Sequence, residues 1–186
     1  MRWTAGLIAG AALLTGCGDN SKDVALENVS VAEAAKQAQA ANRLEPGQWE
    51  STVQIVSAEM PGAPPAVADA LKKAASAQTA KSARCLTPEE ANKPAADLLS
   101  GGQSKDCRYE TFTMANGRID AVMVCKPQAG QPGEMRMTMG GAYTPARFDI
   151  VMKMSMGAMP GLPAGQGMVM TAKAQGRRVG ECTTAG

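Results

Sequence analysis

Cysteines are the residues of this chain with the most distinctive chemistry. Cys17 follows Leu14-Thr15-Gly16 at the end of a short apolar run, a pattern typical of a bacterial lipobox. That run, preceded by Arg2, is too short to span a bilayer, which takes ~20 apolar residues, but it suits a signal peptide. We therefore expect residues 1–16 to be a lipoprotein signal peptide and the Cys17 thiol to carry a lipid.

The other four cysteines suit disulfide chemistry in an oxidising compartment. Residues 107–125 are predicted to form a hairpin around Asn116-Gly117. A three-residue loop at Ala115–Gly117, closed by Met114 and Arg118, puts the two cysteines of this segment directly opposite each other. The spacing therefore pairs Cys107 with Cys125 and leaves Cys85 to pair with Cys182.

The same hairpin register makes two further predictions. It places Tyr109 opposite Met123 and Thr111 opposite Ala121, on the face that carries the cysteines.

On a loop-entropy model the shorter and the longer disulfide loop contribute roughly 3 and 4.7 kcal/mol to stability. No Cys-x-x-Cys motif is present for redox catalysis.

Acid–base chemistry has few candidate residues in this sequence. Histidine is absent, which excludes Ser-His-Asp and Cys-His catalysis and histidine-based zinc sites. The adjacent acids Glu89 and Glu90 follow Thr87-Pro88, a pattern that predicts a capping box at a helix start. Glycoside hydrolysis by carboxylates alone stays open, but the acidic residues are scattered. We therefore expect a protein that is not an enzyme and that has no catalytic residue, cofactor or metal ligand.

Methionines form two period-2 stripes, and period 2 places each stripe on one face of a strand. A turn centred on Thr144-Pro145 would put Met137 opposite Met152 and Met135 opposite Met154, so both stripes share one sheet face. That face is a protein core, a flexible groove for a lipid or peptide, or a Cu(I) site. The scarcity of other large apolar residues in these strands favours the core. The candidate residues are Met135, Met137, Met139, Met152, Met154 and Met156.

Charge gives no sign of a nucleic-acid partner. The chain has 19 Lys and Arg residues against 17 Asp and Glu residues, with the two signs interspersed. A nucleic-acid-binding surface needs a concentrated basic patch. We therefore expect no nucleic-acid binding.

The patterning also predicts the elements that position these residues. Residues 17–45 are expected to be a lipidated tether with a possible helical spacer, which either stands free or docks on the domain. A single domain is expected over 46–186. Its expected strands and helices give an α+β fold, an antiparallel sheet of about six strands packed on two helices and stapled by disulfides. The expected elements of this domain are a strand near 48–56, helices at 64–82 and 88–99, the hairpin at 107–125, and strands at 134–143, 147–156, 168–175 and 179–182.

Several motifs in a fixed order resemble a known family. After the lipobox they are Pro-Gly-Gln-Trp-Glu at 46–50, Met-Pro-Gly-Ala-Pro at 60–64, Cys-Leu-Thr-Pro-Glu-Glu at 85–90, the cysteine hairpin, the methionine-rich strands, and Arg-Val-Gly-Glu-Cys at 178–182. Over about residues 44–182 the chain resembles domain-of-unknown-function family 3617, small secreted or lipid-anchored bacterial envelope proteins. The resemblance implies a structural framework and a compartment, and the four cysteines fit it. It implies no reaction or ligand.

We therefore expect a lipid-anchored periplasmic protein that acts as a non-catalytic binding or structural module of the cell envelope. Its expected partners are a membrane, through the Cys17 lipid, and a hydrophobic ligand or an envelope protein. Gly18, rather than Asp, follows the lipidated cysteine, which favours the outer membrane over the inner one. The alternatives are a soft-metal or oxidative-stress protein that uses the methionine face, and an inhibitor of a cell-wall enzyme.

Overall fold

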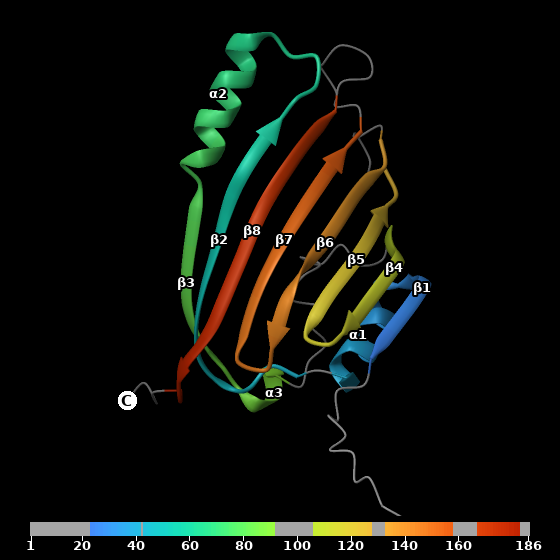
Figure 1. The fold of residues 1–186 in the computed structure, drawn as a ribbon, viewed down its shortest axis with the longest axis vertical. Helices are drawn as coiled ribbons and strands as arrows, with labels where there is room; N and C mark the ends of the chain where they lie inside the picture. Colours follow the sequence, from blue (N-terminus) through green and yellow to red (C-terminus); the bar gives the residue numbers. More distant parts are fainter. Residues whose placement is uncertain (1–22, 42, 92–105, 128–132, 158–166, 183–186) are drawn as a thin grey trace, which may run out of the picture.

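The computed structural model describes residues 23–41, 43–91, 106–127, 133–157 and 167–182. Their main element is an eight-stranded sheet with the order β1-β4-β5-β6-β7-β8-β2-β3, in which all neighbours are antiparallel (Figure 1). The strands are β1 (Val24–Ser30), β2 (Gly47–Glu59), β3 (Thr79–Leu86), β4 (Cys107–Ala115), β5 (Arg118–Cys125), β6 (Met135–Thr144), β7 (Arg147–Met156) and β8 (Met168–Gly180). The helices within the described ranges are α1 (Val31–Ala41), α2 (Pro65–Ser76) and α3 (Pro88–Ala91).

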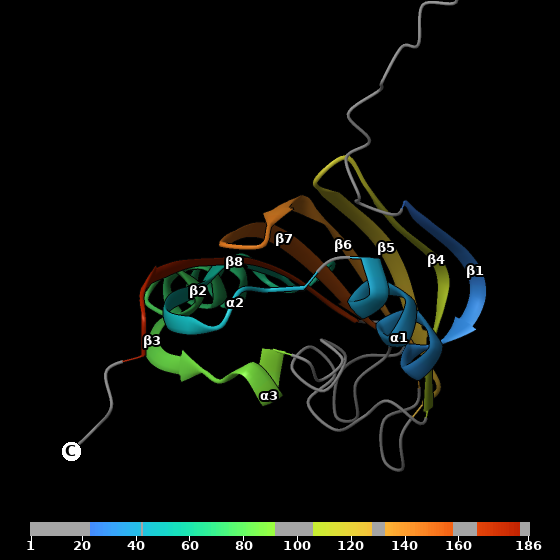
Figure 2. The same cartoon turned by 90° about the horizontal axis from the view of Figure 1, so that it is seen from below.

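The sheet is strongly curved, and α1 lies inside the curve (Figure 2). Side chains alternate along the strands, so one set faces this concave side and the other faces the convex side. The convex side carries ion pairs, including Arg136–Glu110 at 2.7 Å, Lys173–Asp149 at 3.4 Å and Arg177–Glu50 at 2.9 Å. The concave side is mainly apolar, and α2 packs against β2 at the other end of the sheet from α1.

The core lies between α1 and the strands β1, β4 and β5. Val31, Ala34, Ala35 and Ala38 recur at the i, i+3, i+4 and i+7 spacing of one helix face, and all four are buried. The helix begins where the Ser30 hydroxyl accepts a hydrogen bond from the Glu33 amide at 3.1 Å, which is an N-cap. Residues 24–41, which lie within the expected tether, therefore pack on the sheet, and the folded unit begins upstream of residue 46.

The sheet has eight strands where about six are expected, and two strands absent from the sequence analysis account for the difference. Residues 23–43 contain β1 before the helix, and the expected helix over 64–82 ends at Ser76, after which β3 begins. Both new strands are edges of the sheet. The segments expected at 168–175 and 179–182 are one strand, β8. Of the helix expected over 88–99, the first turn is α3, and residues 92–99 lie outside the described residues.

The cysteine hairpin has the expected cysteine pair but a different turn. Ala115 pairs with Arg118, so the loop has two residues, Asn116 and Gly117, both with positive φ. Such a pair is typical of a type I′ turn. The expected closing pair, Met114 with Arg118, is therefore wrong, and so is Thr111 opposite Ala121.

A bulge restores the expected register beyond this turn. The register shifts between Tyr109 and Thr111, so Tyr109 lies opposite Met123 and Cys107 lies opposite Cys125. A β-bulge adds one residue to one strand, which offsets the one-residue difference in the loop. The two cysteines consequently have Cα atoms 3.9 Å apart and form a disulfide.

The β6–β7 hairpin also has a corrected register. Thr144 pairs with Arg147, so the turn is centred on Pro145-Ala146 rather than on Thr144-Pro145. Met137 therefore faces Met154 and not Met152, and Met135 faces Met156 rather than Met154. Moving the turn centre by one residue shifts the register by two, and because the side-chain period is also two, the stripes still share one face.

The backbones of β6 and β7 approach each other closely at Gly141. A Cβ atom at this position would lie 2.2 Å from the Asp149 carbonyl oxygen and 2.8 Å from the Ile150 Cα atom. Only glycine fits such an approach, which is a common role of glycine within a strand.

Candidate functional site

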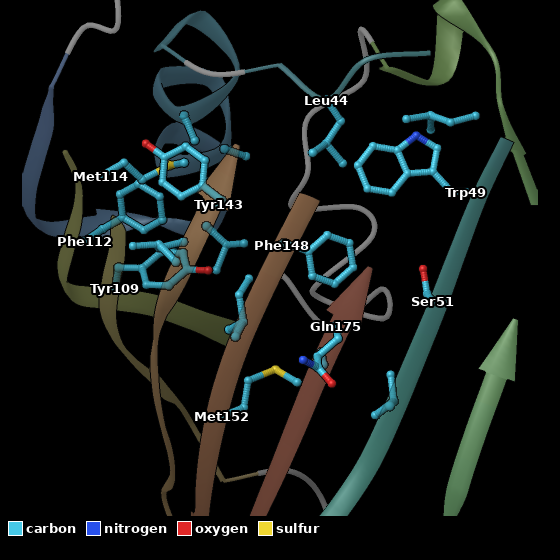
Figure 3. A pocket seen from close by; sticks show the side chains of 18 of the residues that line it. Leu44, Trp49, Ser51, Tyr109, Phe112, Met114, Tyr143, Phe148, Met152 and Gln175 are labelled. Carbon is cyan, nitrogen blue, oxygen red and sulfur yellow. The ribbon is translucent and has the colours of Figure 1, made fainter. Parts of the chain in front are cut away.

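The concave face contains a cavity of about 440 Å³ between α1 and the strands of the sheet (Figure 3). Small-molecule sites typically measure roughly 300–1,000 Å³ and are mainly apolar. All five aromatic residues that follow Trp3 line this cavity. They are Trp49, Tyr109, Phe112, Tyr143 and Phe148.

One wall is formed by Trp49 and Phe148. The indole nitrogen of Trp49 donates a hydrogen bond to the Glu45 carbonyl oxygen at 2.9 Å, which fixes the ring. The rings of Trp49 and Phe148 stack with centroids 6.1 Å apart and planes inclined by 17°. Phe148 in turn lies over Gly176, where a Cβ atom would be 2.3 Å from the ring. The absence of a side chain at Gly176 therefore allows Phe148 to lie flat along the cavity.

The facing wall is formed by β4 and α1. Tyr109 and Phe112 meet edge to face, with centroids 5.1 Å apart and an interplanar angle of 65°. Val31, Ala35 and Ala38 of α1 complete this wall. Burial raises the pKa of the Tyr109 phenol, because the surroundings disfavour the phenolate. Tyr109 is therefore a neutral hydroxyl at physiological pH.

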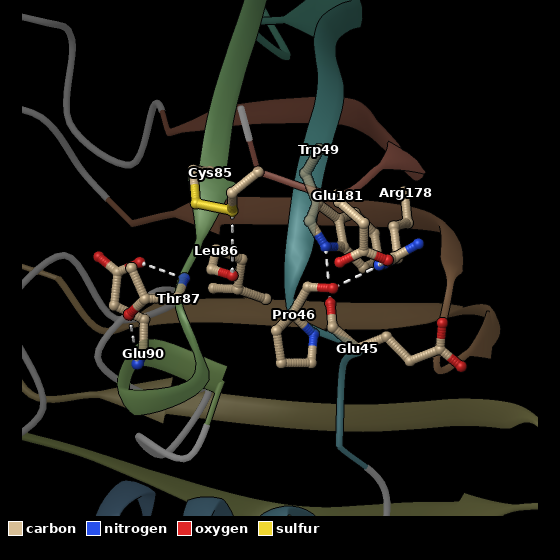
Figure 4. The surroundings of a disulfide bond; sticks show 10 residues. Glu45, Pro46, Trp49, Cys85, Leu86, Thr87, Glu90, Arg178 and Glu181 are labelled. Carbon is tan, nitrogen blue, oxygen red and sulfur yellow. Dashed lines mark hydrogen bonds and ion pairs between the residues drawn. A yellow bond between two sulfur atoms is a disulfide. The ribbon is translucent and has the colours of Figure 1, made fainter. Parts of the chain in front are cut away.

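The disulfide between Cys85 and Cys182 braces the end of the sheet beside Trp49 (Figure 4). Next to it, Arg178 donates a hydrogen bond from Nε to the Pro46 carbonyl oxygen at 2.6 Å and forms an ion pair with Glu181. These contacts join the end of β8 to the segment that enters β2. The backbone that carries Trp49 is thus held by a covalent and a charged link.

The acidic pair expected at a helix start has that role. The Thr87 amide donates to the Glu90 carboxylate at 3.0 Å, and the Glu90 amide donates to the Thr87 hydroxyl at 3.2 Å (Figure 4). These two reciprocal bonds are a capping box. Glu90 is therefore engaged in the start of α3.

The methionines continue the apolar face beyond the cavity. The register aligns four of them in one row across β5 to β8, namely Met123, Met137, Met154 and Met170. Met123 is buried, and the other three are half-buried. We call this set the methionine row.

The structure places the residues singled out by sequence as follows. Cys17 lies outside the described residues, and the other four cysteines form the two expected disulfides. Of the six candidate methionines, Met139 is buried in the core and Met152 lines the cavity. The others are half-buried, namely Met135, Met137, Met154 and Met156.

The sequence analysis missed the aromatic cavity. The sequence contains one indication of this cavity: Tyr143 and Phe148 fall on the same alternate strand positions as the methionine stripes, and therefore on the same sheet face. Alternation alone did not reveal that β8 brings β2, and with it Trp49, next to β7. The cavity therefore depends on strand order, which local patterns do not encode.

Two further findings concern the described residues alone. They contain no cluster of three or more His, Cys, Asp or Glu side chains placed to hold a metal ion. None of their helices combines the length and the apolar character needed to cross a bilayer.

Comparison with known proteins gives one family match. The sequence model of a family described as "Protein of unknown function (DUF3617)" matches residues 44–182. The matched region includes β2 to β8, whereas β1 and α1 precede it. Neither the curated proteins nor the solved structures contain a match.

Proposed function

This chain belongs to the DUF3617 family, whose description names no activity, and we propose that it is a non-catalytic module that binds a small apolar ligand in its concave cavity. The observation that carries this proposal is that every aromatic side chain after Trp3 lines that one cavity. Trp49, Tyr109 and Phe112 are buried, whereas Tyr143 and Phe148 are half-buried. Together the five rings surround a space of about 440 Å³.

We further propose that the module is anchored to a membrane by a lipid on Cys17 and is located in the periplasm, with the outer membrane favoured over the inner. The lipobox around Cys17 and the two disulfides support this placement, because disulfides persist in oxidising compartments. The change Cys17→Ala should release the protein from the membrane fraction. Membrane attachment of this variant at the wild-type level would contradict the anchor.

The binding proposal can be tested with N-phenyl-1-naphthylamine, a neutral apolar dye whose fluorescence rises when it leaves water. The purified protein should bind the dye at a single saturable site. The change Ala174→Phe should block this binding, because Ala174 lines the cavity and a phenyl ring would occupy its space.

The matched control is Val151→Phe. Val151 is 44% exposed and faces the convex side, so a ring there should leave dye binding unchanged. A second cavity variant, Phe148→Ala, removes one ring of the Trp49–Phe148 wall and should weaken binding while keeping the space open. Folding of each variant is checked by circular dichroism. Saturable binding that is equal in wild type and folded Ala174→Phe would place the dye outside the cavity and overturn the proposal.

One observation favours a second candidate function, the binding of Cu(I). The methionine row brings four thioethers into adjacent register, and thioethers are ligands that Cu(I) prefers. Three of these side chains are only half-buried, so a metal ion has access to them. Melting the wild type and methionine variants with and without Cu(I) separates this candidate from a packing role.

A further inference from the structure

An arginine lies at the rim of the apolar cavity. Arg84, on the edge strand β3, pairs in register with Trp49 and is one of the residues that line the cavity. It is exposed, and none of the described acidic side chains forms an ion pair with it. Arg178, which pairs with Trp49 from the other side, is by contrast engaged by Pro46 and Glu181. Arg84 therefore offers a cation beside the stacked aromatic wall.

The lining away from this rim is mainly apolar, and its polar groups are uncharged: Ser51, Gln175 and the hydroxyls of Tyr109 and Tyr143. At the end beneath α1, the cavity is lined by Val31, Ala35, Phe112 and Met114. An ionised group could not be buried there without a partner, because desolvation of a charge in apolar surroundings is very costly. An apolar segment of a ligand fits that end, and an anionic group finds a cation only at the rim, because Arg84 is the one charged residue among the described lining residues.

From this arrangement we infer that the ligand is an amphiphile with one apolar tail and an oxyanion head, a carboxylate or a phosphate, and that Arg84 binds the head. This inference rests on the proposed binding function. A guanidinium group suits either head because its planar donors match two oxygens at once. The tail lies between the Trp49–Phe148 wall and α1.

The test measures displacement of N-phenyl-1-naphthylamine by dodecanoate and by 1-dodecanol, both below the concentration at which they aggregate. The two compounds share the tail and differ in the charged head. The wild type should bind dodecanoate more tightly than dodecanol. The change Arg84→Gln should weaken dodecanoate binding about fivefold, which corresponds to the ~1 kcal/mol of a favourable exposed ion pair. Dodecanol binding should not change. Dodecyl phosphate, run in parallel, shows which oxyanion is preferred.

The control variant is Arg118→Gln, which removes an exposed arginine from the hairpin turn of β4 and β5. It should leave dodecanoate binding unchanged, and Arg84→Lys should keep part of it. Equal dodecanoate affinity in wild type and Arg84→Gln, or an equal loss in Arg118→Gln, would overturn the role of Arg84. So would wild-type protein that binds dodecanol as tightly as dodecanoate. In these cases dye and dodecanol still bind, whereas failure of the proposed function itself would appear as no saturable dye binding.

Discussion

Replacing Met139 with alanine should destabilise the protein more than replacing Met154, if the methionine face mainly packs the fold. Met139 is 6% exposed and belongs to the core cluster beneath α1. Truncating a buried methionine typically costs about 2–5 kcal/mol. Met154 is half-buried in the methionine row, so less of its surface leaves water on folding. We therefore expect a loss of about 1–2 kcal/mol for Met154→Ala.

The assay is urea denaturation followed by circular dichroism, with both disulfides intact. Because the midpoint equals the unfolding free energy divided by the slope m, an unchanged slope allows the midpoints to be compared directly. Val151→Ala serves as the control, since this side chain is 44% exposed on the convex face. Its effect should stay within about 0.5 kcal/mol, as is usual for surface substitutions.

The same proteins are then melted with and without Cu(I) under anaerobic conditions. A ligand that binds only the native state adds RT ln(1 + [L]/Kd) to its stability, about 2.7 kcal/mol at a hundredfold excess over Kd. Packing predicts no Cu(I) effect on the melting temperature. A mild effect of Met139→Ala, together with Cu(I) stabilisation that Met154→Ala abolishes, would refute the packing role and support the Cu(I) candidate.

Three further predictions concern the scaffold. In thermal melts, Gly141→Ala should cost about 1–3 kcal/mol or more because its Cβ would lie 2.2 Å from a backbone oxygen; Gly180→Ala meets nothing within 4 Å and should be tolerated, so equal effects would contradict the close approach. Replacing Cys85 and Cys182 together by alanine should lower the urea-unfolding free energy by up to ~4.7 kcal/mol, since the bond closes a loop of 97 residues; an unchanged midpoint would refute this. Burial raises the pKa of Tyr109 above 10.0, so its contribution to stability is full below pH 10.0 and is lost as the pH rises through the raised pKa. In unfolding measured at increasing pH, Tyr109→Phe should remove this alkaline loss of stability. A pH profile identical to that of the wild type would contradict the assignment.

The sequence predicted the central strands well because their alternation reflects one apolar and one polar side. It failed at the two edges. β3 contains Thr79-Ala80-Lys81-Ser82, residues with low β-propensity apart from the threonine, and β1 contains Glu27 and Asn28. These segments are strands because a neighbouring strand provides the hydrogen bonds. Such tertiary context is not visible in a local window.

The cysteine hairpin shows how a correct pairing can follow from an incomplete derivation. The expected three-residue loop does not form, yet Cys107 still lies opposite Cys125 because a bulge near Glu110 compensates for the shorter turn. Loop type follows from Asn116-Gly117, whereas bulges lack a comparably strong local signal. A register predicted from a turn is therefore most reliable close to the turn. The distant pair, Cys107 with Cys125, matches the prediction only because the bulge compensates for the shorter loop.

The strand order also has a consequence for the order of folding. β4 to β8 follow one another in chain and in space, so each hairpin can form as soon as its second strand is synthesised. β2 is synthesised early and can pair with β3, but its other partner, β8, is the last of the described strands. The bond from Cys85 to Cys182 must wait equally long. Pairings between distant segments form slowly because their loop entropy is lost before any contact compensates for it. We therefore expect closure of β2 onto β8 to be the slow step, and any early bond from Cys85 to Cys107 or Cys125 to require thiol–disulfide exchange before the sheet is complete.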